Sequence, residues 1–166
     1  EWAGDQVKDT SLPLQVQVQA RVFEPGNGRA TRTDMSLPLR TRDTYIGIRP
    51  TFDGRYAREG ADTEFDIVAV DSTGKQVAKP SVQYTVEHIT YSYQWYQTDA
   101  RWRWQTITNE RLIAADTLAL KADQPTRLAK KLSWGSHRLT IIDREANTST
   151  SMTFYVGWYG GTKGEE

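Results

Sequence analysis

The chain has no cysteine among its 166 residues. Disulfides, zinc–thiolate sites, iron–sulfur clusters, cysteine nucleophiles and thioesters are therefore excluded within it. Histidine is almost as scarce, because His88 and His137 are the only two. The residues before His137 lack the Gly-x-Ser-x-Gly pattern that presents a nucleophilic serine. We therefore expect no Ser-His-Asp triad, and we expect no bound metal or cofactor.

An excess of charge of one sign is also missing. Lysine plus arginine number 21 and aspartate plus glutamate number 21, so the formal charge is zero. Nucleic acids and anionic membranes bind basic surfaces, so we expect neither as a partner. No apolar run approaches the roughly 18–20 residues of a membrane span. The first residues do not form a signal peptide, so we expect a mature chain or an excised segment.

Strand-like alternation of apolar and polar residues runs through the chain. Residues 16–22 and 31–39 alternate on either side of a turn signal at 25–28, which predicts a hairpin. Further short runs follow up to residue 156, giving about ten strands at the spacing of a β-sandwich or barrel. The segment 109–115 is ambiguous, because Asn109 could also cap a short helix there.

The aromatic residues gather in one predicted hairpin around residues 99–100. Pairing about that turn sets Trp95 opposite Trp104, and Tyr93 and Trp102 then share their face. An exposed aromatic row of this kind could stack on sugar rings or on a partner protein. Because each such side chain buries about 150–250 Å², a polar chain gains more by using the row as core. We therefore expect Trp95 and Trp104 to be buried.

The opposite face of the same hairpin carries Tyr96, Arg101 and Arg103. An aromatic ring flanked by two guanidinium groups suits a protein contact. We predict that these three residues form an interdomain or partner contact.

Three carboxylates alternate at Asp62, Glu64 and Asp66. Residues two apart on a strand are separated by about 6.6 Å, which falls within the roughly 6.5–9.5 Å window of an inverting glycosidase pair. A solvated strand face opposite Phe65 and Ile67 explains the alternation more simply. We therefore favour the solvated face and keep a glycosidase fragment as a minor alternative.

Several sequence pieces from residue 43 to 159 appear together in an order typical of one family. They are YIGIRPTFDG at 45–54, EFDIVAVD at 64–71, GK at 74–75, YQWY at 93–96, WRW at 102–104, WGSHRLT at 134–140 and FYVGWY at 154–159. With these pieces the segment resembles a macroglobulin-like domain of the bacterial alpha-2-macroglobulins. It looks most like the sixth such domain, which lies just before the bait-region domain.

The resemblance implies a fold and a division of the chain. Macroglobulin-like domains are antiparallel β-sandwiches of immunoglobulin or fibronectin type, so the fold is expected to be all-β. Residues 43–160 would form one such domain. Residues 1–42 would supply the last strands of a preceding macroglobulin-like domain, and residues 161–166 would be a linker.

The resemblance also implies a function. Proteins of this family are periplasmic protease traps anchored to the inner membrane, in which cleavage of a bait region makes the inhibitor collapse around the protease. In many members a thioester then couples to the protease. This chain has no thioester cysteine and no evident bait loop. It is therefore expected to be a non-enzymatic scaffold segment whose partners are neighbouring domains and, through the whole inhibitor, target proteases.

Another class of function remains open beside this one. A carbohydrate-binding or adhesin-type β-sandwich would use the Trp-rich hairpin as its binding surface. The two classes differ in what they require of Trp95 and Trp104, because a stacking platform must be exposed.

Overall fold

A computed structural model describes residues 14–23, 25–26, 28–99 and 101–158. The chain divides into two compact units, residues 1–43 and 44–166. Within the described ranges, all regular secondary structure is β-strand. In that part of the chain no helix is long and apolar enough to cross a membrane. The possible helix at 109–115 is wrong, because these residues lie inside the strand β8 (Arg101–Leu120).

The first unit contains a hairpin of β1 (Leu14–Phe23) and β2 (Ala30–Leu39). Val16 pairs with Leu37 and Val18 with Met35, so the predicted hairpin and its apolar face are confirmed. Most of its side chains are exposed. That this hairpin completes a preceding domain stays a prediction.

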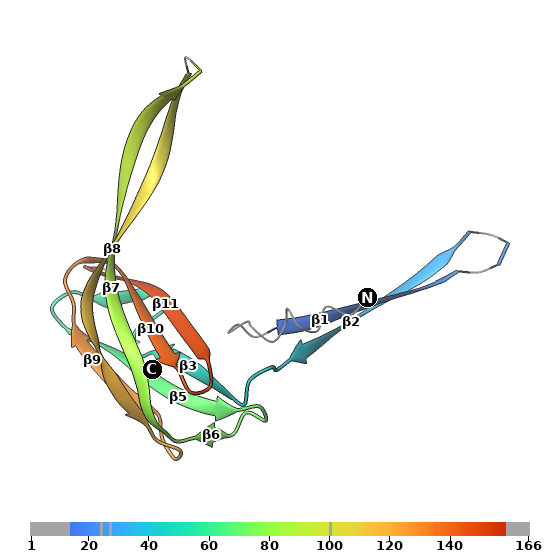
Figure 1. Ribbon diagram of the computed structural model, residues 1–166, viewed down its shortest axis with the longest axis horizontal. Helices are drawn as coiled ribbons and strands as arrows, with labels where there is room; N and C mark the ends of the chain where they lie inside the picture. The colour runs from blue at the N-terminus through green and yellow to red at the C-terminus, as the bar shows by residue number, and fades with distance from the viewer. Residues whose placement is uncertain (1–13, 24, 27, 100, 159–166) are drawn as a thin grey trace. The chain divides into compact units, whose positions relative to one another are not determined.

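Two β-sheets make up the second unit (Figure 1). In spatial order, the five-stranded sheet contains β4 (Tyr56–Arg58), β11 (Thr148–Gly157), β10 (Gly135–Asp143), β7 (Lys79–Thr98) and β8. The other sheet contains β3 (Thr44–Pro50), β5 (Asp62–Asp71) and β6 (Gln76–Val77), and β9 (Thr126–Lys131) also pairs with β5. All pairs are antiparallel except β4 with β11. The predicted all-β sandwich is confirmed, whereas the predicted linker at 161–166 lies outside the described residues.

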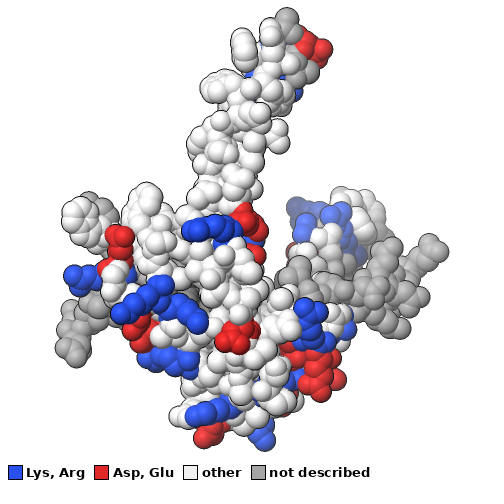
Figure 2. All heavy atoms as spheres, turned by 60° about the vertical axis from the view of Figure 1, so that its left-hand side comes forward, with Lys and Arg blue, Asp and Glu red and all other residues white. Residues whose placement is uncertain are grey.

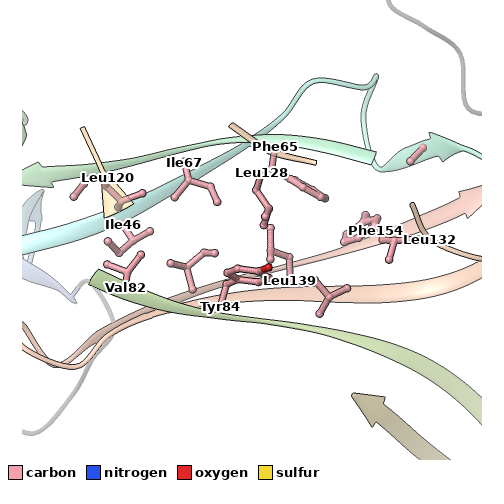
Figure 3. Packing of buried hydrophobic residues seen from close by; sticks show 14 of the residues in the cluster. Ile46, Phe65, Ile67, Val82, Tyr84, Leu120, Leu128, Leu132, Leu139 and Phe154 are labelled. Carbon is pink, nitrogen blue, oxygen red and sulfur yellow. The ribbon is translucent and has the colours of Figure 1, made fainter. Parts of the chain in front are cut away.

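The core fills the space between these two sheets (Figure 3). Phe65 of β5 and Phe154 of β11 meet edge to face with ring centroids 5.0 Å apart. Ile67, Leu139 and Ile141 are fully buried around them. These side chains come from alternate positions of their strands, as expected when one face of each sheet points inward.

The strands β7 and β8 are much longer than their neighbours. Each has 20 residues, and they pair with each other as far as Thr98 and Arg101. The next strand, β10, pairs with β7 only across Gln83–Ile89. The distal hairpin, which we define as residues 90–99 and 101–109, therefore projects beyond the sandwich (Figure 1). A register shift between Val86 and Glu87 marks its base, where a bulge bends and twists a strand.

Candidate interaction surface

The pairing in the distal hairpin agrees with the sequence prediction. Trp95 lies directly opposite Trp104, and Gln97 lies opposite Trp102. Tyr93 packs on Trp104 edge to face, with ring centroids 6.0 Å apart. Together with Tyr91, these side chains occupy one side of the hairpin, because cross-strand partners and residues two apart share a face.

Exposure of these rings contradicts the predicted core. Trp95 is 64% exposed and Trp104 is 60% exposed. Tyr91, Tyr93 and Trp102 are also more than half exposed. We call these five side chains the aromatic face.

Two features explain why the aromatic face is not part of the core: the alternation of side chains along β7 and the length by which the hairpin extends past β10. On β7 the residues of the core cluster, Val82, Tyr84 and Val86, occupy even positions and point inward, whereas the buried Ile89 lies outside that cluster. Tyr93 and Trp95 occupy odd positions, so alternation turns them to the other side of the strand. They also lie past Ile89, where β10 has stopped pairing with β7. No second sheet among the described strands reaches them.

The opposite face of the distal hairpin holds the three predicted contact residues. Tyr96 pairs with Arg103 across the strands, and Arg101 pairs with Thr98 next to the turn. Tyr96 is 41% exposed, and both arginines are exposed. Their role in a contact stays a prediction, but the structure does place them together on one accessible surface.

The carboxylate series on β5 is less uniform than predicted. Asp66 is buried at the centre of a rung that runs across β3, β5 and β9. The two oxygens of Asp66 accept hydrogen bonds from Arg49 at 2.8 Å and from Arg127 at 2.9 Å. Arg127 also binds Glu64, at 2.8 Å, whereas Asp62 is exposed. The prediction of one solvated face is therefore wrong for Asp66, whose partners lie far away in the sequence.

The electrostatics of Asp66 do not suit the general acid of a glycosidase. Its hydrogen bond with Arg49 lowers the pKa of this carboxyl, burial opposes that effect, and Arg127 lowers the pKa further. A general acid of a glycosidase needs the reverse, a raised pKa that keeps the proton near neutral pH. The arrangement suits an ion-pair network that ties three strands together.

The two histidines meet at the base of the distal hairpin. His88 of β7 pairs with His137 of β10, and their ring centroids lie 4.9 Å apart. His137 is fully buried, stacks on Phe154 and donates from Nδ1 to the carbonyl of Gly135 at 3.1 Å. Burial lowers the pKa of His137, the bond to Gly135 raises it, and His88 lowers it. A neutral ring packed in this way supports the fold and does not suit proton transfer. The sequence did not predict the pairing of the two histidines, because they lie on strands that are far apart in the chain.

A smaller aromatic group lies beside β4 and β11. The ring of Tyr155 contacts Tyr56 at 6.2 Å and Trp134 at 5.6 Å between centroids. A hollow of about 430 Å³ is lined by Arg55, Tyr56, Ser136, Thr153, Phe154 and Tyr155. Nothing in the local sequence pattern indicated this group, because its members come from three separate segments.

The exposed aromatic side chains of the second unit form a surface suited to binding. Within the described ranges, no three histidine or acidic side chains are grouped so as to hold a metal ion. Six of the exposed large hydrophobic side chains of the second unit lie on the distal hairpin, whereas the most exposed one, Trp158, lies outside it. Such a surface can contact a partner through apolar and stacking interactions.

Comparison with known proteins gives the family. The sequence profile described as bacterial macroglobulin domain 6 matches residues 47–158. The chain belongs to this family. The match covers most of the sandwich and the whole distal hairpin, so both features lie inside the family domain.

Relatives place the domain in a particular kind of protein. The chain is 27% identical to an alpha-2-macroglobulin of Xylella fastidiosa, over 90% of this chain and 9% of that protein. It is 28% identical to the alpha-2-macroglobulin of Escherichia coli, over 92% of this chain and 10% of that protein. The chain thus spans about a tenth of the length of these curated relatives and carries a macroglobulin-like domain of a bacterial alpha-2-macroglobulin.

Solved structures agree with this assignment. The native conformation of the E. coli alpha-2-macroglobulin matches with a TM-score of 0.78 and 28% identity, over 95% of this chain and 11% of that one. A Salmonella alpha-2-macroglobulin reacted with methylamine matches with a TM-score of 0.77 and 25% identity, over 92% of this chain and 11% of that one. The resemblance seen in the sequence is therefore confirmed at the level of family and fold.

Proposed function

We propose that this chain is a scaffold segment of a protease-trapping alpha-2-macroglobulin. The observation that carries the proposal is the match of residues 47–158 to a bacterial macroglobulin domain, within a chain that aligns with about a tenth of the length of alpha-2-macroglobulins. The segment would act by holding other domains in position before and after a protease cuts the bait region. It would have no catalytic activity of its own.

The location and partners of the whole protein belong to the same proposal. The parent polypeptide would lie in the periplasm, be anchored to the inner membrane as a lipoprotein and serve in bacterial defence. Its partners would be target proteases, whereas this segment would contact neighbouring domains. Zero net charge agrees with a segment that binds neither nucleic acid nor the membrane surface.

A protease-shielding experiment tests the trap. The longer polypeptide that contains this chain is incubated with porcine elastase, and hydrolysis of a small peptide substrate is compared with hydrolysis of a large protein substrate. A trap that encloses the protease should suppress cleavage of the large substrate and leave much of the small-substrate activity. Equal activity toward both, or equal loss of both, would overturn the trapping proposal.

The exposed aromatic face favours a second candidate, carbohydrate binding. Exposed Trp95, Trp102 and Trp104 are what a stacking platform for sugar rings requires. Titration of this chain with a hexamer of N-acetylglucosamine, followed by tryptophan fluorescence, tests that candidate. We expect no saturable change; a saturable change that Trp95→Ala removes would favour the carbohydrate function instead.

A further inference from the structure

We propose that the aromatic face of the distal hairpin docks on another domain of the same polypeptide. This proposal rests on the proposed function, because it requires the chain to be part of a longer protein. It differs from the sequence prediction, which chose the opposite face and stays untested. The binding face is the one with Trp95 and Trp104 rather than the one with Tyr96 and Arg103.

The distal hairpin lacks support from its own domain. Beyond Ile89 on β7, the described strands offer only β8 as a pairing partner. A two-stranded hairpin alone is marginally stable in water and needs a further strand or a packed face. The extended form of the distal hairpin therefore calls for a surface that covers one of its faces.

The area of the aromatic face is sufficient for a specific contact. Its five side chains are between 55% and 69% exposed. With about 150–250 Å² for each aromatic side chain, they present on the order of 600 Å² to solvent. A standard interface buries about 800 Å² per partner, so this face would supply most of the area. Trp and Tyr also lose few rotamers on binding, which favours their use as anchors.

Charge distinguishes the two faces and describes the partner. The charged residues of the distal hairpin are Asp99, Arg101 and Arg103, and both arginines lie opposite the aromatic face. In Figure 2 the hairpin is almost entirely white between its tip and its base, whereas blue and red atoms are spread over the sandwich. A complementary surface is therefore apolar and uncharged, like the buried centre of a protein interface.

Tethering favours a domain of the same polypeptide over a separate molecule. The relatives are about ten times as long as this chain, so most of their polypeptide lies outside the matched region. A tethered partner acts at an effective concentration in the millimolar range. Within one polypeptide, a contact of this size therefore needs only a modest affinity to be occupied most of the time.

Photocrosslinking in the longer polypeptide tests the docking. The photoreactive residue p-benzoylphenylalanine replaces Trp95 on the aromatic face or, as the matched control, Tyr96 on the opposite face. Irradiation of the purified protein at several concentrations is followed by mass spectrometry of the crosslinked peptides. Circular dichroism melts of both variants show whether the fold is retained.

We expect position 95 to crosslink to a peptide of the same molecule outside residues 1–166, several-fold more than position 96 and independently of concentration. Crosslinks that grow with concentration would identify a second copy and overturn the proposal. So would a higher yield at position 96, or no crosslink in a folded variant. If the crosslink is absent but protease shielding is intact, only the docking proposal is overturned. If shielding is lost but the crosslink is retained, only the trapping proposal is overturned.

Discussion

Trp95 and Trp104 lie directly opposite each other on β7 and β8, and both are at least 60% exposed. Direct pairing without burial means that the two rings stabilise the isolated chain little. Their area becomes useful only when another surface covers it, which is the basis of the proposed docking.

Truncation of one of these rings separates the two roles. We expect Trp104→Ala to change the free energy of unfolding of this chain by less than about 1 kcal/mol, as surface substitutions usually do. Phe154→Ala removes a core ring that is 2% exposed, so it should cost on the order of 3–5 kcal/mol. Urea denaturation of both variants gives the comparison. A loss of similar size for Trp104→Ala would mean that the ring is packed in the free chain.

The rung of Asp66 with Arg49 and Arg127 predicts a pH-dependent contribution to stability. Asp66→Asn keeps the shape but removes the charge that holds both guanidinium groups. We expect a loss of about 1–2 kcal/mol at neutral pH, because bonds to charged groups are strong and the exposed arginine ends are screened by water. Asp62→Asn is the exposed control and should change little.

The sign of the pH effect follows from the direction of the shift. The pKa of Asp66 in the folded chain lies below its ordinary value of 3.8. The stabilisation is therefore complete above about pH 3.8 and is lost as the pH falls through the lower folded pKa. The difference between wild type and Asp66→Asn should shrink over that acidic range. A difference that stays constant from pH 7 to pH 2 would contradict the assigned ion pair.

A second ion pair joins β7 to the end of β10. Lys79 lies 3.0 Å from Asp143, whose side chain is only 1% exposed. Burial is the largest single influence and lowers the pKa of Lys79, but the hydrogen bonds and charges of Asp143 and Glu145 together outweigh it, so the net shift is upward. Lys79→Met leaves a buried carboxylate without its cationic partner and should lower the free energy of unfolding by on the order of 3 kcal/mol.

A double variant checks that explanation of the loss. In the wild type, Asp143 accepts hydrogen bonds from the backbone N–H groups of Glu145 and Ala146. Asp143→Asn keeps a side-chain oxygen that can accept the same two hydrogen bonds. Adding it to Lys79→Met should restore part of the stability, because no charge is left buried. Lys131→Met, at an exposed site, is the control for the substitution itself. Thermal melts showing no recovery in the double variant would point to lost packing of the lysine stem instead.

The division of the chain also gives a stability prediction. All residues of the hydrophobic core lie between Ile46 and Val156, so residues 43–160 should fold without the first unit. Their thermal unfolding should be cooperative and close to that of the whole chain. An unfolded or molten product would assign the β1–β2 hairpin to the same core and would remove the proposed domain boundary.

Strand pairing within the distal hairpin could be predicted from the sequence, whereas the burial of its side chains could not. Alternation and turn residues predicted that Trp95 faces Trp104, because the register of a hairpin depends on nearby residues alone. Alternation shows which side chains share a face, but it does not show which face points inward. Whether Trp95 is buried depends on where β10 stops pairing with β7, and that is set by residues far along the chain.

The same limit explains the other differences. Asp66 looked solvated because its partners, Arg49 and Arg127, are 17 and 61 residues away in the sequence. The segment 109–115 looked partly helical because Asn109 resembles a cap, whereas pairing with β7 keeps it extended. Tertiary pairing overrides such weak local preferences. The sequence pieces typical of the family predicted the fold correctly, because a family resemblance refers to a complete fold and not to a local pattern.

Hydrogen exchange of the distal hairpin tests the central claim most directly. Amide exchange of residues 91–97 and 102–108 is measured by mass spectrometry in this chain and in the longer polypeptide that contains it. Docking of the aromatic face should slow exchange in the longer polypeptide by at least about tenfold, since an uncovered two-stranded hairpin opens readily. The amides of β10 serve as the internal reference and should be protected equally in both. Equal exchange of the distal hairpin in the two proteins would contradict the docking of its aromatic face.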